Sequence, residues 1–247
     1  MTAEERIRQA RDNPAAYEDR YVALVDVLGW SDIVSRSATD PSVLPQVAEA
    51  AEIIGYAREW AENTNAISRK FSERESEPLE MDVRASHFSD HFAFSLPISS
   101  TAEVALMGMV GQLCIHLLDR GHYTRGAIVR GLVRHTPSVI YGPSLIEAHR
   151  IESCVAKFPR IVVTPEAAGA FESDWFLRKD FDGLTHLDYL RPYKATAEHV
   201  AWLDRLKAMA DGKADADAGR LDRLSKHWWF KGYVDEVLNR ARAEVTG

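Results

Sequence analysis

The first half of the chain alternates short apolar runs with amphipathic stretches. An aliphatic run from Tyr21 to Leu28 ends in a glycine, which is typical of a buried strand followed by a tight turn. The segment from Gly29 to Arg36 should start a short helix, which Asp40-Pro41 should break. A longer helix is predicted from Val43 to about Asn65. Its predicted apolar stripe comprises Val47, Ala51, Ile54 and Ala57 or Arg58.

The middle of the chain predicts a hairpin and then a helix. Lys70 to Glu80 is polar and contains a proline, so we expect an exposed loop there. Arg84 to Leu96 predicts two strands joined tightly around Ser89-Asp90. The clearest helical period spans residues 101–119, after a capping pattern at Ser100 to Glu103. Its predicted apolar face comprises Val104, Met107, Val110, Cys114 and Leu117.

The order of the elements predicts the fold class. The remaining predicted elements are a polar helix at 2–13, strands at 124–133, 138–141 and 160–164, a helix opening at Gly142-Pro143, a hairpin around Asp182-Gly183 between 176 and 190, and a helical tail from Thr196 that is broken at 210–219. This order predicts an α+β sandwich of the ferredoxin-like type, an antiparallel sheet with helices packed on one face. We expect an N-terminal helix at 1–19, one domain at 20–193 and a helical extension at 194–247.

Composition narrows the class of protein. Of the 247 residues, 46% are hydrophobic and 27% are charged, as in ordinary soluble globular proteins. The net charge of −7 argues against a polyanion-binding surface, so no nucleic-acid partner is expected. The first residues lack the apolar core of a signal peptide and no run approaches membrane-spanning length, so we expect a cytoplasmic protein without a membrane partner. Cys114 and Cys154 are predicted to be buried thiols on helices, in a reducing compartment.

Two carboxylates sit in otherwise apolar strands. Asp26 interrupts the first apolar run, and Asp90 lies at the tip of the predicted hairpin. A carboxylate there is costly to bury unless something pairs with it. A shared divalent cation would do so, because magnesium binds through one or two carboxylates plus substrate phosphates. The alternative is that each aspartate caps a turn or pairs with a buried arginine. Gly29 lets the backbone turn tightly, so the amides of Val27 to Trp30 are candidates to face a phosphate.

An arginine two turns into the helix that opens at Gly142-Pro143 is the third candidate. The guanidinium of Arg150 would stabilise charge that develops on a transferring phosphoryl group. The alternative is an ordinary helix salt bridge, since Glu147 lies three residues before it. Taken alone, the salt bridge is the favoured interpretation.

Four segments in order resemble the class III nucleotidyl cyclases. Val25-Asp-Val-Leu-Gly-Trp30 resembles the metal-binding first strand of that family, and Phe88-Ser-Asp90 resembles its Gly-Asp hairpin, which carries the second metal aspartate. Arg125 to Gly131 is similar to the following Arg-x-Gly-Ile strand, and Gly142 to Glu152 is similar to the helix that ends in Ala-Ala-Arg-Leu-Glu. Together the segments cover about residues 20 to 190.

The resemblance implies an antiparallel homodimer with active sites at the subunit interface and a catalytic domain at 20–193. Asp26, the adjacent Val27 and Asp90 would bind two Mg²⁺ or Mn²⁺ ions. One ion would activate the ribose 3′-hydroxyl and the other would hold the triphosphate. The partner subunit's Arg150 would stabilise the transition state, and attack on the α-phosphate would release pyrophosphate and leave a 3′,5′-cyclic nucleotide.

The positions at which the chain departs from the family indicate which nucleobase it binds. The family's asparagine, four residues before the arginine, is Ile146 here. The lysine and aspartate with which purine-specific members read the base are replaced by Ser86 and Val139, and the guanine-type Glu/Cys pair is also missing. With Tyr141 to Ala148 and Leu187 to Leu190, the chain resembles the pyrimidine cyclases of bacterial Pycsar anti-phage defence.

In that family UTP or CTP is cyclised on phage infection, and the product switches on a separate effector protein. A uridylate cyclase that forms cUMP is the expectation, because that activity is the commoner one in the family. The sequence itself does not separate uracil from cytosine. An adenylate cyclase with unfamiliar base contacts and a catalytically dead nucleotide sensor, motivated by Ile146, remain alternatives.

Several further residues have two interpretations. The expected nucleotide-contacting residues are Leu28, Gly29, Trp30, Ser86, Val139, Tyr141 and Arg178. Tyr141 would otherwise be a core tyrosine, and Arg178 would otherwise lie at a solvated strand end. His87 and His91 are expected on the opposite strand face from Asp90 and are not expected to bind metal. Trp228-Trp-Phe230 is interpreted as packing or as a dimer contact.

Overall fold

The computed structural model describes residues 2, 4, 5, 8, 16–72, 81–171 and 175–246, except for the side chains of 71 and 72. Most of the helix predicted at 2–13 lies outside these residues, as do positions 73–80 of the predicted loop. The strands are β1 (Glu18–Val27), β2 (Arg84–Phe88), β3 (His91–Pro97), β4 (Thr124–His135), β5 (Ile140–Tyr141), β6 (Ile161–Val163), β7 (Leu177–Lys179) and β8 (Thr185–Leu187). The helices are α2 (Trp30–Ser37), a 3₁₀ turn η1 (Pro41–Val43), α3 (Leu44–Ser72), α4 (Ser100–Leu118), α5 (Pro143–Cys154), α6 (Pro165–Ala168), α7 (Ala197–Ala216) and α8 (Leu221–Thr246).

One sheet organises the chain, with strand order β2-β3-β1-β4-β6-β8-β7 and β5 paired to β4 beside that path. The pairings are antiparallel except for β4 with β6, which is parallel. A largely antiparallel sheet covered by helices confirms the predicted α+β fold class. The predicted hairpin around Ser89-Asp90 is confirmed as β2 and β3.

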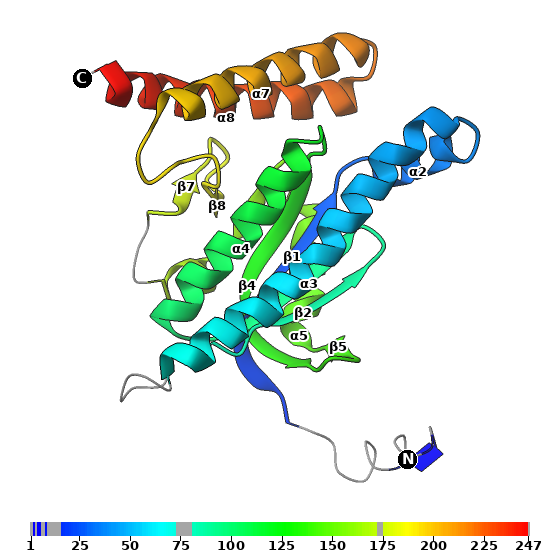
Figure 1. Cartoon of the computed structure of the whole chain (residues 1–247), viewed down its shortest axis with the longest axis vertical. Helices are drawn as coiled ribbons and strands as arrows, with labels where there is room; N and C mark the ends of the chain where they lie inside the picture. The colour runs from blue at the N-terminus through cyan, green and yellow to red at the C-terminus, as the bar shows by residue number, and fades with distance from the viewer. Residues whose placement is uncertain are drawn as a thin grey trace.

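Helices cover both faces of this sheet, so the expectation of helices on one face is wrong. Alternate residues of β1 point to opposite sides: Tyr21, Ala23 and Val25 join the core under α3 and α4, whereas Val22 and Leu24 pack toward α5. Figure 1 shows α3 and α4 side by side across one face. Because β1 is apolar on both sides, each face needs its own cover. Asp26 continues the Val22 and Leu24 series, toward α5.

The C-terminal helices α7 and α8 pack against each other at one end of the sheet (Figure 1). Phe230 is fully buried, with its ring centroid 4.8 Å from that of Tyr123. Trp229 stacks on Phe158, whereas Trp228 is exposed, so packing accounts for two of the three aromatic residues. The predicted break at 210–219 is too long: α7 continues to Ala216, because alanine and lysine in that stretch favour a helix.

The predicted apolar faces of two helices are confirmed in part. On α3, which extends to Ser72, the buried positions include Ala50, Ile54, Ala57 and Ala61, whereas Ala51 and Arg58 are exposed. On α4, Ser99 caps the N-terminus. Val104 is 54% exposed, but the rest of the predicted face is buried: Met107, Val110, Cys114 and Leu117. Because α4 is apolar around most of its circumference, the sequence period alone does not fix which side meets the sheet.

The apolar composition of α4 has a structural cause. The helix is long and apolar enough to span a membrane, contrary to the sequence expectation, but 61% of that apolar window is buried inside the domain. It packs on β1, β3, β4 and α3 as a core helix. Cys114 on this helix is buried as predicted, whereas Cys154, the last residue of α5, is exposed and corrects that prediction.

Candidate active site

Asp26 and Asp90 meet at the end of β1. The register pairs Val25 with Phe92, which brings the tip of the β2–β3 hairpin next to Asp26. One side-chain atom from each of Asp26, Asp90 and His91 lies within 4.8 Å of the other two. Trp30 Nε1 donates a hydrogen bond to Ser89 Oγ at 3.1 Å, which fixes the hairpin tip against α2. The two carboxylates predicted to share a cation therefore lie together.

The environment of Asp26 disfavours its charge. The residue is 4% exposed. Burial, a hydrogen bond shared with Asp90 and the nearby Glu152 charge raise the pKa of Asp26 to about 7, although the hydrogen bond from Arg125 opposes the shift. Arg125 Nε donates to Asp26 Oδ2 at 2.9 Å, so the alternative of pairing with an arginine is also realised. A divalent cation would stabilise the ionised form.

Glu152 adds a third carboxylate, which no pattern in the sequence assigns to the site. Arg125 Nε lies 2.8 Å from Glu152 Oε1 but directs its hydrogen to Asp26. Glu152 is 1% exposed and its Oε1 has no hydrogen-bond partner in the described part of the chain. The ion pair with Arg125 offsets part of the cost of burying this carboxylate, and an unmet hydrogen bond remains. Oxygen donors from Asp26 and Asp90, with the buried Glu152 carboxylate nearby, fit a hard divalent cation.

Two histidines also belong to the site. His91 Nε2 lies 3.7 Å from Asp26 Oδ1, and His91 Nδ1 lies 3.4 Å from Asp90 Oδ1, so the expected placement of His91 away from Asp90 is wrong. The register explains this, because His91, Ala93 and Ser95 share the face of β3 that Asp26 shares on β1. His91, His149 and Glu152 form a second group of potential ligands within 4.8 Å of one another. The i,i+3 spacing of His149 and Glu152 places them on one face of α5, but the spacing does not show what that face contacts.

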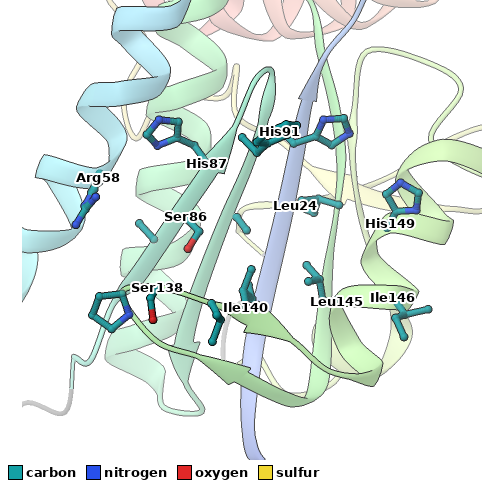
Figure 2. A pocket seen from close by; sticks show the side chains of 15 residues that line it. Leu24, Arg58, Ser86, His87, His91, Ser138, Ile140, Leu145, Ile146 and His149 are labelled. Atoms are coloured by element: carbon teal, nitrogen blue, oxygen red, sulfur yellow. The ribbon is translucent and has the colours of Figure 1, made fainter. Parts of the chain in front are cut away.

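A cavity of about 610 Å³ opens beside this cluster, a size typical of small-molecule sites. Its walls come from β2, β3, α5 and the turn that precedes β5. His91 and His149 line the cavity and also belong to the groups of potential metal ligands. Ser86 and Val139, the two predicted base-contacting positions, both line it, and Figure 2 shows Ser86 facing the same space as Ile140 and Leu145. The cavity is mainly apolar, with the hydroxyls of Ser86 and Ser138 among its polar groups.

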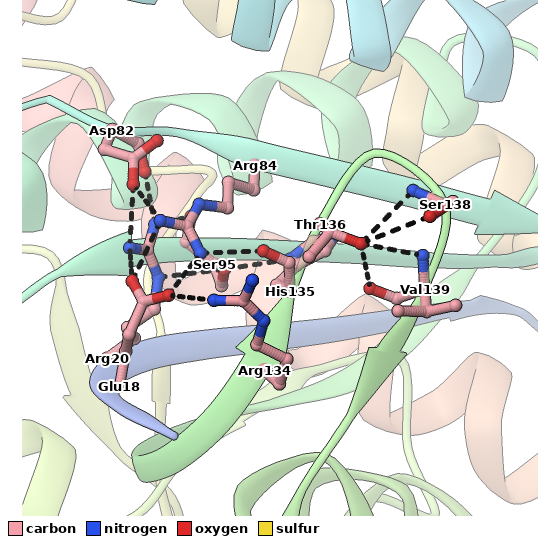
Figure 3. A network of polar contacts seen from close by, with 10 residues as sticks. All are labelled: Glu18, Arg20, Asp82, Arg84, Ser95, Arg134, His135, Thr136, Ser138 and Val139. Carbon is pink, nitrogen blue, oxygen red and sulfur yellow. Dashed lines mark hydrogen bonds and ion pairs between the residues drawn. The ribbon is translucent and has the colours of Figure 1, made fainter. Parts of the chain in front are cut away.

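A polar network lies behind Ser86. Ser86 Oγ is 2.9 Å from His135 Nε2, and His135 Nδ1 is 2.8 Å from Ser95 Oγ. Arg20 Nε donates to Ser95 Oγ at 3.1 Å. Burial, with the charges of Arg20 and Arg84, lowers the pKa of His135 to about 4. Figure 3 shows how Glu18 and Asp82 join this network through both arginines.

The turn after β1 has the predicted shape but fewer free amides than expected. Gly29 has a φ of 81°, the left-handed conformation that favours glycine, and it leads directly into α2. The amide of Leu28 donates to the Tyr123 carbonyl at 2.8 Å, so Leu28 does not offer its N–H to a phosphate. The first-turn amides of α2, from Trp30 onward, have no intrahelical acceptors and remain suited to an anion.

Other predicted residues lie apart from this cluster. Arg150 is 57% exposed on α5 and makes two hydrogen bonds of 2.8 and 2.7 Å to Glu147. Arg178 pairs with Glu236 of α8, with its guanidinium carbon 5.1 Å from the Tyr233 ring centroid. Arg150, Arg178 and Tyr141 are not among the described residues that line the cavity. Val27 continues β1 beside Asp26, paired with Thr124.

Comparison with known proteins gives a similarity of structure only. No protein-family model matches the chain, and no curated protein matches its sequence. The monomeric guanylyl cyclase domain of the RhoGC fusion protein from the aquatic fungus Blastocladiella emersonii is similar, with a TM-score of 0.48 and 13% identity over 70% of this chain and 96% of that one. The catalytic core of a rhodopsin-guanylyl cyclase with converted specificity, solved in complex with ATPαS, has a TM-score of 0.44, with the same identity and coverage. At this level the similarity assigns neither a substrate nor residue roles to this chain.

Proposed function

We propose that this chain is a metal-dependent nucleotidyl cyclase that converts UTP to 3′,5′-cyclic UMP and pyrophosphate. The observation that carries the proposal is the meeting of Asp26 and Asp90 at the edge of a mainly apolar cavity. Two carboxylates beside a nucleoside-sized cavity suit phosphoryl chemistry on a ligand whose base lies inside it. Val139 in the wall has no side chain that can hydrogen-bond a base, which favours a pyrimidine over the purines.

Asp26 and Asp90 would hold Mg²⁺ or Mn²⁺, two ions per site by the resemblance to class III cyclases. When bound, the ions lower the pKa of the ribose 3′-hydroxyl and neutralise the triphosphate. Arg125 orients the Asp26 carboxylate through its 2.9 Å hydrogen bond, and the amides at the start of α2 would bind phosphate oxygens. Val27 is proposed to complete the metal site from the adjacent position of β1.

The transition state would be stabilised across a homodimer. Arg150 is exposed on α5, as a residue acting in the partner's active site must be. Its ion pair with Glu147 would exchange for the α-phosphate on dimerisation and substrate binding. Arg178 would reach the triphosphate only after leaving Glu236. The product would act as a second messenger on a separate effector protein in anti-phage defence, in the cytoplasm.

Product analysis tests this function. Purified protein with Mn²⁺ and an equal mixture of the four nucleoside triphosphates should give cUMP by mass spectrometry. Asp26→Ala and Asp90→Ala should each abolish the product, because each removes a proposed metal ligand. Asp222→Ala, at an exposed position in the first turn of α8, is the matched control and should retain activity. Absence of any cyclic nucleotide from folded wild-type protein would refute the proposal.

The same reaction mixture separates the alternatives. Cyclic CMP as the main product would indicate a cytidylate cyclase, and cyclic AMP would indicate an adenylate cyclase. A catalytically dead sensor has one observation in its favour: Ile146, which stands in place of the family's asparagine, is 71% exposed at the cavity wall. Tight nucleotide binding by calorimetry without turnover would favour that reading.

A further inference from the structure

The polar network behind the cavity polarises the Ser86 hydroxyl as a donor. Arginine is only a donor, so the bond from Arg20 Nε occupies a lone pair of Ser95 Oγ. Ser95 is completely buried, and its own proton needs an acceptor. Within the described chain, the acceptor in reach of Ser95 Oγ is His135 Nδ1 at 2.8 Å. Ser95 therefore donates to His135.

This bond selects the tautomer of His135. The two arginines and the burial of the ring keep His135 neutral, so it carries one ring proton. With Nδ1 accepting from Ser95, that proton is on Nε2. Nε2 then donates to Ser86 Oγ across 2.9 Å. The carboxylates of Glu18 and Asp82 face the same network but are themselves paired with Arg20 and Arg84.

These hydrogen bonds form a relay that runs from Arg20 through Ser95 and His135 to Ser86. Its last proton, on Ser86 Oγ, is available to the cavity. Ser86 Oγ accepts from His135, and its remaining O–H has no acceptor in the part of the chain that the structure describes. The other hydroxyl in the wall, Ser138, has no fixed direction, because its contact with Thr136 Oγ1 is 3.4 Å and either atom can donate. Ser86 Oγ keeps a second lone pair, but a hydroxyl that accepts from a chain of donors starting at the Arg20 guanidinium is polarised toward donating.

We propose that this relay from Arg20 to Ser86 selects the base, because an O–H polarised as a donor pairs better with the carbonyl of uracil at ring position 4 than with the amine of cytosine. The inference rests on the proposed function and names the substrate within it. Ser86 is the group that would contact the base, and Ser95 and His135 are positioning residues.

Three substrates test the relay in the unmodified protein. We would measure kcat/KM with Mn²⁺ for UTP, for CTP and for the triphosphate of zebularine, a pyrimidine nucleoside with no substituent at ring position 4. One net hydrogen bond changes affinity by about 2- to 12-fold, so we expect UTP to exceed both other substrates by about tenfold. Equal values, or a preference for CTP, would overturn the inference.

Variants distinguish the effect of the relay on base selection from a general loss of stability. Ser86→Ala should reduce the UTP:CTP ratio to about one, since the donor is removed. Ser95→Ala should also lower the ratio although Ser95 does not line the cavity, because His135 then adopts either tautomer. Ser144→Ala is the matched control: it removes another buried serine hydroxyl, which bonds the Leu132 carbonyl, and should leave the ratio unchanged.

A spectroscopic measurement needs no turnover. The ¹⁵N NMR shifts of His135 should show the hydrogen on Nε2 in the wild type, and a shift toward a mixture in Ser95→Ala. A wild-type hydrogen on Nδ1 would overturn the relay whatever the enzyme does. If no nucleoside triphosphate is bound or turned over, the proposed function fails and the base assignment fails with it. Turnover of UTP and CTP at equal rates overturns the base assignment alone.

Discussion

Replacing Asp26 with asparagine should stabilise the metal-free protein while it removes activity. The pKa of Asp26 is raised from its ordinary 3.8 to about 7, first by burial and then by Asp90. The difference corresponds to about 4 kcal/mol, at about 1.4 kcal/mol for each pH unit. An asparagine has the same shape and still accepts the hydrogen bond from Arg125, but it has no charge to bury.

The pH dependence has a definite sign. A carboxyl whose pKa is raised in the folded state binds more protons there than in the unfolded chain between pH 3.8 and about 7. Its contribution to stability is therefore complete below pH 3.8 and is lost as the pH rises through about 7. Wild type and Asp26→Asn should have similar free energies of unfolding at about pH 4, and the variant should be more stable by up to about 4 kcal/mol at about pH 8.

Urea denaturation in EDTA, at several pH values, measures this difference. Comparing two variants at the same pH cancels the other titrating groups, including His135, whose lowered pKa has the opposite sign. Asp222→Asn, exposed on α8, should show no difference at either pH. If Asp26→Asn is no more stable than wild type at pH 8, the carboxylate is not buried in the way described and the argument for a cation at this position is lost.

Three further predictions follow from the packing and from the proposed dimer. Cys154 is exposed and should react quickly with a maleimide, whereas Cys114 should react only on unfolding, because burial raises its pKa to about 12. Phe230→Ala should lower the free energy of unfolding by about 3–5 kcal/mol in urea, since the ring is fully buried against Tyr123. Mixing inactive Asp26→Asn with inactive Arg150→Ala should restore about a quarter of wild-type activity, because in a two-fold dimer half of the pairs are mixed and carry one intact site. No restoration would show that Arg150 does not act across an interface.

Local patterns were enough to predict most of the elements and the pairing of Asp26 with Asp90. A charge inside an apolar strand is visible in the sequence. Antiparallel pairing of β1 with β3 then brings the end of one strand beside the start of the other. Predicting which face of the sheet a side chain occupies requires the register of the paired strands. The prediction for His91 is wrong because the face of the sheet that its side chain occupies depends on which residues of β3 and β1 are opposite each other.

The rest of the site could not be predicted because its residues are ordinary in sequence. Glu152 looks like any helix glutamate until α5 is found to cover the second face of the sheet, where its carboxylate is buried beside Arg125. Ser95 and His135 lie 40 residues apart in the sequence, and neither has a sequence neighbour that indicates a relay. These roles arise from long-range packing, which periodicity does not encode.

The two halves of the proposed metal site belong to parts of the sheet with different local stability. Asp26 is on β1, a central strand bonded on both sides and covered on both faces, whose amides should exchange with solvent only on global unfolding. Asp90 is at the tip of the β2–β3 hairpin, and β2 is an edge strand whose hairpin can open locally. A cation bound by both Asp26 and Asp90 would link the β2–β3 hairpin to β1, the most protected strand of the sheet. Hydrogen exchange should therefore slow in the hairpin when Mn²⁺ binds and stay unchanged in β1.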